Sequence, residues 1–398
     1  MSRIVEVSLI GILLVITLPA VFSCTYLGIA TVLSGRLATP RRSSRRLRFD
    51  VIVPAHDEAA VIARCVASVQ KLAWPADRFR VIVVADNCSD ATPAIARAAG
   101  ARVLQRRDPS RCGKGHALQF AFRWSGREQW ADAVAVVDAD SEVSTNLLEA
   151  FAARIERGAH AIQAHYGVLN PRVTWRTRLM AIAQAAFHIV RSRARERLHL
   201  SCGFRGNGWC VTRVLLQRVP YEAFSLAEDI EYGIDLGLAG YRVHYADEAS
   251  VLGEMVSSAH GAKGQRQRWE GGRFALLRSR TLQLLRASVR NRSAVCFDLA
   301  LDLLVPPLAY IALTVATLIL AAALAFWWDA RFVAPVWLAL ACESVLLLYV
   351  LRGWQLSGTG ARGLADLVHA PVFVLWKVIV MLSRQQSREW VRTERERS

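Results

Sequence analysis

The sequence predicts an α/β domain with a mostly parallel sheet, joined to α-helical transmembrane segments. Short β-branched runs alternate with helical stretches between residues 49 and 137, which is the pattern of βαβ units. Long apolar segments lie on both sides of that region. Acidic residues follow three of the predicted strands, so one edge of the sheet carries groups suited to chemistry.

Residues 1–35 are expected to form an N-terminal transmembrane helix. The stretch from Ile4 to Leu33 is almost entirely apolar, interrupted by Glu6 and Pro19, and it is longer than the core of a signal peptide. One arginine precedes it, whereas six lie in the basic linker of residues 36–48. The positive-inside rule therefore predicts that the linker and the domain after it are cytosolic.

Residues 49–271 form the predicted α/β domain. A helix is expected over Ala59–Leu72 and another after Asp90, which is a candidate N-cap. The expected strands are Phe49–Pro54, Arg80–Ala85, Ala101–Gln105 and Ala133–Val137. In a parallel sheet of this kind, ligands bind at the carboxyl ends of the strands.

The acidic residues fall at those carboxyl ends. Asp57 and Glu58 follow the first strand, Asp86 the second, and Asp138 and Asp140 the fourth. Any one of them is explained equally well as an ordinary loop carboxylate, but three acidic strand ends in one sheet favour a binding site. The pair Asp138-Ala-Asp140 offers oxygen ligands to Mg²⁺ or Mn²⁺, and such an ion would hold a diphosphate.

Two glycine-rich segments are not nucleotide-binding fingerprints. Gly113-Lys114-Gly115 lacks the upstream Gly and the following Ser or Thr of a P-loop, and the Gly203–Gly208 segment has the wrong glycine spacing for a dinucleotide site. Lys114 is still expected to bring a positive charge to a nucleotide. Gly206 and Gly208 are expected to let the backbone approach a sugar closely.

The segment Gln265-Arg266-Gln267-Arg268-Trp269 places amide, guanidinium and indole groups on neighbouring turns of one helix. Such a set can bind a diphosphate and stack on a sugar ring. A basic amphipathic helix anchored by a Trp explains the segment equally well when it is taken alone.

Taken in order, these motifs resemble the family 2 glycosyltransferases, specifically the membrane-bound synthases of cellulose, chitin, hyaluronan and poly-N-acetylglucosamine. The resemblance covers about residues 49 to 273. It rests on Val53-Pro54-Ala55-His56-Asp57-Glu58, Asp86, Asp138-Ala-Asp140, Glu228-Asp229 and Gln265 to Trp269. It implies a GT-A-like fold that binds a nucleotide sugar.

The resemblance also implies a role for each matching residue. Asp229 would be the catalytic base, and Asp140 would bind the metal ion, Mg²⁺ or Mn²⁺. The remaining positions fall into three groups: Pro54, Glu58, Asp86, Lys114 and Asp138 for the donor nucleotide; Gln265, Arg268 and Trp269 for the diphosphate and acceptor; and Gly206, Asn207 and Glu228 for the acceptor pocket. Two positions depart from the family pattern, Ala227 for the usual Thr and Asn87 for a second Asp, and neither removes a required charge.

The C-terminal part is expected to be membrane-associated. Residues 272–297 are predicted to form a basic amphipathic interfacial helix, and the stretch Thr174–Leu200 has the same character; a solvated basic face on a core helix is the alternative for both. Residues 298–352 are predicted to form two transmembrane helices, Leu299–Trp328 with a kink at Pro306-Pro307, and Phe332–Leu351. Residues 353–398 are predicted to form an interfacial or re-entrant helix and a basic cytosolic tail, since a fourth crossing would place the tail arginines outside.

The composition fits this arrangement. The chain is 53% hydrophobic and carries 50 Lys and Arg against 33 Asp and Glu, a net charge of +17, which suits a protein lying against anionic membrane lipids. No nucleic-acid-binding motif accompanies the charge, so no nucleic-acid partner is expected. The eight cysteines form no CxxC pair and are expected to be reduced and mostly buried.

The sequence therefore predicts a multi-pass protein of the cell inner (plasma) membrane with a cytosolic, inverting glycosyltransferase domain. It would use a UDP-sugar and extend a polysaccharide or a lipid-linked saccharide, with export or polymerisation proteins as candidate partners. Two alternatives are transfer of a single sugar to a lipid acceptor and a catalytically degenerate transport or scaffold subunit.

Overall fold

The computed structural model describes residues 3–255 and 259–382, with side chains for residues 17–255 and 271–376. Within these limits the chain forms two compact units. Of the described residues, 3–35, 178–194 and 304–382 belong to the helical unit, and 36–177, 195–255 and 259–303 belong to the α/β unit.

The α/β unit is built on one sheet of eight described strands. Their order is β3 (Arg102–Arg106), β2 (Phe79–Asp86), β1 (Phe49–Ala55), β4 (Ala133–Val136), β7 (Trp209–Thr212), β6 (Ala161–Val168), β8 (Val243–Gly253) and β5 (Ser141–Val143). Strands β3, β2, β1 and β4 are parallel, as are β6 and β8, whereas β7 and β5 are antiparallel to their neighbours. The four predicted strands are confirmed to within one residue at each end, and the mostly parallel α/β fold is confirmed.

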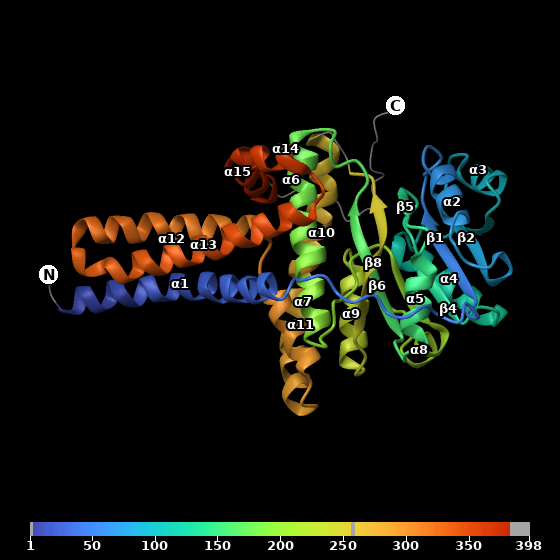
Figure 1. Cartoon of the computed structure of the whole chain (residues 1–398), viewed down its shortest axis with the longest axis horizontal. Coiled ribbons are helices and arrows are strands. Elements are labelled where there is room, and N and C mark those ends of the chain that lie inside the picture. Colours follow the sequence, from blue (N-terminus) through green and yellow to red (C-terminus); the bar gives the residue numbers. More distant parts are fainter. Residues whose placement is uncertain (1–2, 256–258, 383–398) are drawn as a thin grey trace. The chain divides into compact units, whose positions relative to one another are not determined.

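Side-chain alternation along the strands places one core on each face of the sheet. Val51 and Val53 face the core that holds α2 (Ile62–Gln70), α3 (Thr92–Ala98) and α5 (Leu147–Ile155). Ile52 faces the other core, which holds α4 (Lys114–Glu128), α8 (Arg213–Arg218) and α9 (Glu228–Leu238). All seven residues of β1 are buried, as expected for a parallel strand with helices on both faces (Figure 1).

Two further helices complete the α/β unit. Helices α10 (Ala259–Arg290) and α11 (Ala294–Leu304) form a separate apolar cluster with α9. Leu276 and Leu284 of α10 and Leu299 of α11 are buried in this cluster.

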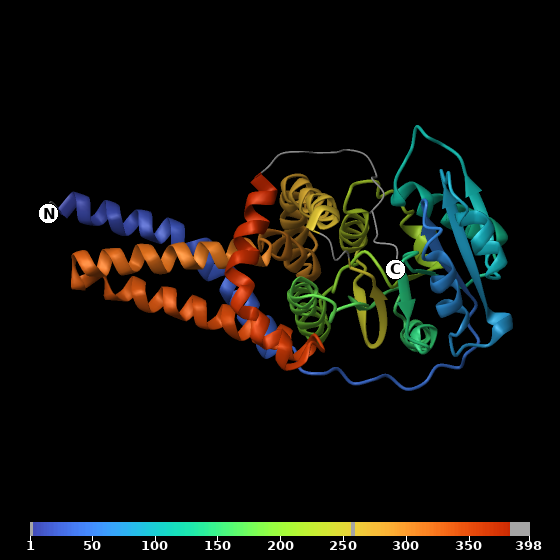
Figure 2. The ribbon, with the colours of Figure 1, turned by 90° about the horizontal axis from the view of Figure 1, so that it is seen from above.

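The basic linker of residues 36–48 lies along the α/β unit as an extended segment (Figure 2). The backbone N–H of Ser43 donates to Glu149 Oε1 at 2.6 Å, and the N–H of Ser44 donates to Glu156 Oε2 at 2.9 Å. The guanidinium of Arg157 donates to the carbonyl of Arg41 at 3.0 Å. These contacts fix the linker onto α5 and the turn that follows it.

In the helical unit, α1 (Arg3–Val32), α12 (Leu308–Trp328) and α13 (Val333–Leu356) lie side by side (Figure 1). Of the described residues, two segments are long and apolar enough to cross a membrane, Leu308–Trp328 and Ala330–Leu356; Thr17–Val32 is a shorter apolar helix. The segment after α13 forms α14 (Gly360–Asp366), a single 3₁₀ turn and α15 (Ala370–Leu382).

The predicted single span from Leu299 to Trp328 is two helices in the structure. Helix α11 ends at Leu304 and α12 begins at Leu308, because Pro306 and Pro307 cannot donate the backbone hydrogen bonds that would continue a helix. Leu299 and Leu303 are buried in the α/β unit. The apolar start of the predicted span therefore contributes to that core.

The arginine-rich stretch Thr174–Leu200 contains α6 (Trp175–Gln184), a π-helical turn (Ala185–Val190) and α7 (Arg191–Arg197). Within the helical unit, Arg178 pairs with Asp366, and buried Arg191 donates to Tyr349 Oη at 3.2 Å. These two arginines are held by protein groups, which differs from the predicted row of lipid-facing charges.

Candidate active site

Lys114 reaches the carboxyl edge of the sheet because two glycines flank it. Gly113 has a φ of +129°, which turns the chain into α4. A Cβ on Gly115 would lie 2.3 Å from the carbonyl oxygen of Ala223, so only glycine allows the first turn of α4 to approach the segment that leads to Glu228.

The Lys114 ammonium joins three segments that are distant in the sequence. Its Nζ lies 2.6 Å from Asp138 Oδ1, after β4, and 3.6 Å from Glu228 Oε1, at the start of α9. It also donates to the carbonyl of Gly206 at 2.5 Å. The three charged side chains are only 19%, 28% and 13% exposed for Lys114, Asp138 and Glu228.

Around Lys114, the carboxyl groups of Asp138, Glu228 and Asp229 outnumber the single ammonium. Burial raises the pKa of Asp138 and of Asp229 above the ordinary value, and the Lys114 charge only partly opposes this effect. Burial likewise raises the pKa of Glu228 to about 7. Burial alone would lower the pKa of Lys114, but Asp138 and Glu228 raise it, so the ammonium stays charged.

Asp229 lies against the glycine-rich loop. A Cβ on Gly206, whose φ is +84°, would lie 3.8 Å from Asp229 Oδ2. The next residue, Asn207, is fully buried and its Oδ1 accepts a hydrogen bond from the backbone N–H of Asp138 at 3.0 Å. The structure therefore brings together Lys114, Asp138, Gly206, Asn207 and the Glu228-Asp229 pair, all of which the sequence nominates.

Asp86 lies at the carboxyl end of β2 with different partners. Its side chain is fully buried, and Arg106 Nη1 donates to its Oδ1 at 2.6 Å. Its Oδ2 has no hydrogen-bond partner among the described residues. Burial raises the pKa of Asp86, while Arg106 opposes that shift. Asp86 is thus a buried acceptor at the edge of the sheet.

Two residues that are predicted to bind the donor nucleotide also make structural contacts. Pro54 is buried in β1 opposite Val84 of β2. The Glu58 N–H donates to Thr92 Oγ1 at 2.8 Å, and its carbonyl accepts from the N–H of Ile62 at 3.0 Å. These contacts connect β1 to α2 and α3, and they do not place either residue at Lys114.

Gln265, Arg268 and Trp269 belong to α10, and their side chains lie outside the described residues. One turn after Trp269, α10 makes a close approach that is described. A Cβ on Gly272 would lie 2.9 Å from the Cβ of Ala227 and 3.0 Å from its N. This contact holds α10 directly against the residue before Glu228-Asp229.

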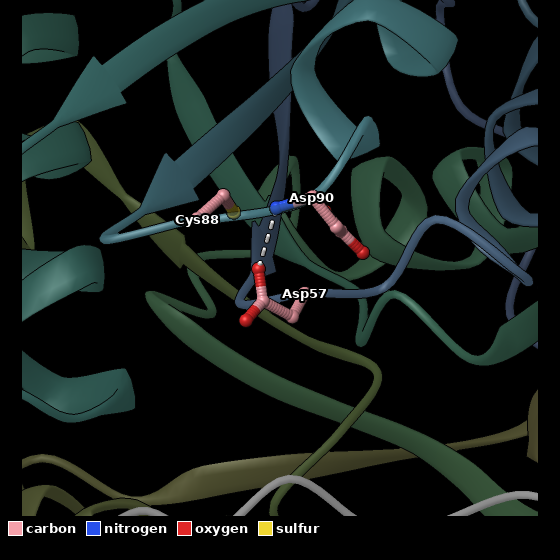
Figure 3. Close-up of side chains that lie close together, drawn as sticks. All are labelled: Asp57, Cys88 and Asp90. Carbon is pink, nitrogen blue, oxygen red and sulfur yellow. Dashed lines mark hydrogen bonds between the residues drawn. The ribbon is translucent and has the colours of Figure 1, made fainter.

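A second acidic group, Asp57, Cys88 and Asp90, has ligand atoms within 4.8 Å of one another (Figure 3). Asp57 Oδ1 already accepts from the N–H groups of Ser89 at 2.7 Å and Asp90 at 3.2 Å, and Oδ2 accepts from Ser89 Oγ at 2.9 Å. Burial raises the pKa of the Cys88 thiol to about 11, so it stays protonated at neutral pH. Mg²⁺ and Mn²⁺ prefer oxygen ligands. The group is therefore better explained as a set of hydrogen bonds that connects the loop after β1 to the loop after β2.

The sequence did not nominate three residues that border the site. Ser141 Oγ donates to Asp140 Oδ1 at 3.0 Å, and buried Gln163 contacts the 205–208 loop. Burial raises the pKa of Tyr166, and Asp140 adds to that shift, so its hydroxyl lies near the acidic group. Only Ser141 had a local signal, because it directly follows Asp138-Ala-Asp140.

The chain is similar to known proteins. A family model described as "Glycosyltransferase like family 2" matches residues 46–298, which is more than half of the chain. The chain is 29% identical over 233 residues to the beta-monoglucosyldiacylglycerol synthase of Synechocystis sp. (strain ATCC 27184 / PCC 6803 / Kazusa), covering 56% of this chain and 47% of that protein. It is 24% identical over 261 residues to the probable glycosyltransferase YdaM of Bacillus subtilis (strain 168), covering 63% and 60%. The chain thus spans about half the length of these relatives.

Among solved structures, the mannosyltransferase PcManGT from Pyrobaculum calidifontis, in complex with GDP-Man and Mn²⁺, is similar with a TM-score of 0.52. The two chains are 20% identical, and the match covers 87% of this chain and 98% of that one. At this identity the likeness supports the fold.

Proposed function

The chain belongs to glycosyltransferase family 2 and is a glycosyltransferase, and from this premise we propose that it transfers a sugar from a UDP-sugar with inversion. The acceptor would be a growing polysaccharide or a lipid-linked saccharide. The polysaccharide-synthase subtype that the motifs resemble is part of this proposal.

One observation carries the proposal. Lys114, Asp138 and Glu228 meet within 3.6 Å at the carboxyl edge of a parallel sheet, and Asp229 lies beside them. The set contains one retained ammonium and several carboxylates with raised pKa values, which is the combination that transfer of a sugar from a diphosphate requires.

In the proposed reaction, Asp229 accepts the proton of the acceptor hydroxyl while that oxygen attacks the anomeric carbon. The bond from the anomeric carbon to the diphosphate oxygen breaks, and the electron pair leaves with the diphosphate. A single displacement inverts the anomeric centre, so an α-linked donor gives a β-linkage. The Lys114 ammonium stabilises the negative charge that develops on the leaving group.

The donor set fits a divalent cation. Asp138, Glu228 and Asp229 surround one ammonium, and Asp140 lies near Asp138. Burial raises the pKa of Asp138, Glu228 and Asp229, so added positive charge would stabilise their ionised forms. Asp138 and Asp140 would hold Mg²⁺ or Mn²⁺, which when bound neutralises charge on the diphosphate. The solved mannosyltransferase contains Mn²⁺, which agrees with this choice.

Asp86 is proposed to accept a hydrogen bond from the donor base or ribose through Oδ2, the oxygen that Arg106 does not bind. UDP is the expected nucleotide. The similar mannosyltransferase was solved with GDP-Man, so a guanine donor is the necessary comparison.

Gln265, Arg268 and Trp269 are proposed to close over the diphosphate and the acceptor sugar. The support comes from the described part of α10, where Gly272, three residues after Trp269, closely approaches Ala227, two residues before Asp229. This position is compatible with a helix that also lies close to a membrane surface.

Membrane association is proposed from the two candidate spans, Leu308–Trp328 and Ala330–Leu356. We propose a plasma-membrane protein whose α/β unit is cytosolic and whose basic segments contact anionic lipids. Two candidate spans among the described residues favour a second candidate function, transfer of one sugar to a lipid acceptor, because extrusion of a polysaccharide needs a wider helical bundle. A relative named as a glucosyldiacylglycerol synthase agrees with this candidate.

The test is nucleotide release by membranes that contain the chain. UDP-glucose, UDP-galactose, UDP-N-acetylglucosamine and GDP-mannose are each supplied with Mg²⁺ or Mn²⁺, and membranes without the protein are the control. Release from a UDP donor is expected, and release from GDP-mannose alone would correct the donor. Product length then separates the two functions, since processive synthesis gives a ladder and single transfer gives one sugar per acceptor.

A further inference from the structure

A buried hydrogen-bond relay connects the glycine-rich loop to the acidic segment after β4. Asn207 is 0% exposed, and its side-chain amide bridges two groups of that segment. Oδ1 accepts from the Asp138 N–H at 3.0 Å, and Nδ2 donates to Ser141 Oγ at 2.7 Å. Ser141 Oγ in turn donates to Asp140 Oδ1 at 3.0 Å.

The directions of these hydrogen bonds follow from chemistry. A backbone N–H can only donate, so the Asn207 atom that faces Asp138 N must be the carbonyl oxygen. The amide nitrogen therefore faces Ser141 and donates to its hydroxyl. The Ser141 proton is then available for Asp140, and the relay has one consistent direction from Asn207 to the carboxylate.

The starting point of the relay is rigidly held. Gln163 of β6 is fully buried, and its Nε2 donates to the carbonyls of Asn207 at 2.7 Å and Gly208 at 3.2 Å. Its Oε1 accepts from the N–H of Arg205 at 2.9 Å. Gly208 has a φ of +70°, and a Cβ there would lie 2.7 Å from Val251, so the loop accepts only glycine at that position.

The relay ends on Asp140, which lies in the turn between β4 and β5. Asp140 follows β4 and is only partly buried, so its orientation depends on such contacts. A hydrogen bond to Oδ1 fixes the plane of the carboxylate. Groups that orient metal ligands in this way typically change metal affinity by about 10- to 100-fold when removed.

We propose that Asn207 and Ser141 are positioning residues for the divalent-metal site, with Ser141 orienting Asp140 and Asn207 orienting Ser141. The inference rests on the proposed function. It changes the role of Asn207 from the acceptor pocket to the metal side of the site. Because Gly206, the residue before Asn207, lies against Asp229, the same loop links the metal side to the base.

The principal variant is Ser141→Ala. It removes the hydrogen bond to Asp140 and the one from Asn207 Nδ2, and it keeps the contact between Asn207 and Asp138. The matched control is Ser68→Ala. Ser68 lies in α2, and its Oγ accepts from the N–H of Val143 at 2.8 Å. Val143 is in β5, the strand that begins with Ser141, but the Ser68 hydroxyl bonds to Val143 and not to Asp140. Asn207→Asp is a second, nearly isosteric variant that removes the donor to Ser141.

The measurement is Mn²⁺ binding to the full chain in detergent with saturating UDP, read from the electron paramagnetic resonance signal of unbound Mn²⁺. Ser141→Ala is expected to raise the Kd for Mn²⁺ by about tenfold relative to Ser68→Ala. Thermal unfolding without metal is measured for both variants. Ser141→Ala loses two hydroxyl contacts and Ser68→Ala loses one, so a somewhat lower Tm is expected for Ser141→Ala, and Mn²⁺ binding is compared at a temperature where both variants are folded. Asn207→Asp is expected to weaken Mn²⁺ binding as well.

Equal Mn²⁺ affinity in Ser141→Ala and Ser68→Ala would overturn the inference. So would sugar transfer by the wild-type chain that needs no divalent ion, and that result would leave the proposed function standing. Failure of the proposed function itself would be seen separately, as Mn²⁺ binding that depends on Ser141 in a chain that releases no nucleotide from any sugar donor.

Discussion

Buried carboxylates lie at both ends of the parallel strands of the α/β unit, and their surroundings differ. At the amino end, Asp50 of β1 is fully buried and accepts three hydrogen bonds, from Arg80 Nε at 2.8 Å, Arg80 Nη2 at 3.0 Å and Ser125 Oγ at 2.6 Å. The Arg80 guanidinium also lies over the rings of Trp130 at 4.2 Å and Trp124 at 5.1 Å. Every polar atom of the Asp50 side chain has a strong partner.

At the carboxyl end, Asp138 and Glu228 share the single Lys114 ammonium, and Asp229 adds a third carboxylate. Burial raises the pKa of all three groups. Burial alone therefore does not decide what a carboxylate does. Complete pairing at Asp50 stabilises the fold, whereas incomplete pairing near Lys114 leaves groups that can take a proton, a cation or a substrate.

The largest expected effect is a loss of activity from a substitution at the carboxyl end of the strands. Asp229→Asn should lower kcat about 10³-fold, because the amide cannot accept the acceptor proton. Nucleotide affinity should be unchanged, since no contact of the variant residue holds the donor. Nucleotide release and nucleotide binding are measured together. Asp235→Asn, on the same helix and near Arg280 at 3.4 Å, is the control that should retain activity. Full activity of Asp229→Asn would remove the base from the proposed mechanism.

A substitution at the amino end of the strands should lower the stability of the chain and leave its activity unchanged. Arg80→Met leaves Asp50 buried without its main partner, which should cost about 3 kcal/mol. For a unit of this size that corresponds to a fall in Tm of roughly 6–12 °C. The KM for the donor should not change. Arg127→Met, at an exposed position of α4, is the control and should leave Tm unaltered. A Tm of Arg80→Met equal to that control would show that the pairing does not stabilise the fold.

A third change tests whether α10 completes the carboxyl end. Gly272→Ala adds a Cβ 2.9 Å from the Cβ of Ala227, so α10 must move away from the Glu228-Asp229 turn. A shift of this kind should lower kcat by about tenfold, because positioning errors well below 1 Å already matter in catalysis. Gly271→Ala is a matched control, since a Cβ there has no atom within 4 Å. Equal kcat values for the two variants would show that the position of α10 does not affect the reaction.

The sequence predicts the carboxyl end better than the amino end, for a physical reason. Asp138-Ala-Asp140 and Glu228-Asp229 are recognisable because the chemistry needs carboxylates at a short, local spacing. The Asp50–Arg80 pair depends on the register of β1 against β2, which no local pattern contains. The relay through Asn207 depends equally on tertiary structure, since it joins residues of the 205–208 loop to residues after β4.

The same limit applies to the predicted membrane segments. Apolar length predicts α12 and α13, but the predicted span also included Leu299, Ala300 and Leu303, which pack inside the α/β unit. Hydropathy does not distinguish a lipid neighbour from a protein core. The break at Pro306 and Pro307 was the available signal, and the structure shows it to be a helix boundary.

A smaller effect should appear in the pH dependence of stability. The folded pKa of Glu228, about 7, lies above the ordinary value of 4.5, so between these values the folded chain holds a proton that the unfolded chain releases. Stability from this group is therefore present in acid and is lost as pH rises through that window. Glu228→Gln should remove the decline, a difference of at most about 1.4 kcal/mol per pH unit. Parallel Tm curves for the variant and the wild type from pH 4.5 to 8 would contradict the raised pKa.

The smallest expected effect is a change in stability from a substitution at the amino end of the strands. Arg102 lies over the same Trp124 ring at 4.4 Å and pairs with Glu128 at 3.6 Å, but its side chain is 50% exposed and contacts no buried carboxylate. Arg102→Ala should therefore cost only about 0.5–1 kcal/mol. Both variants lose a cation over Trp124, whereas only Arg80→Met also loses the partner of Asp50 and the contact with Trp130. Tm measured side by side therefore removes the shared Trp124 contribution from the comparison. A cost for Arg102→Ala as large as that for Arg80→Met would mean that the stacked arginines and tryptophans, and not the pairing of Asp50, stabilise this end of the sheet.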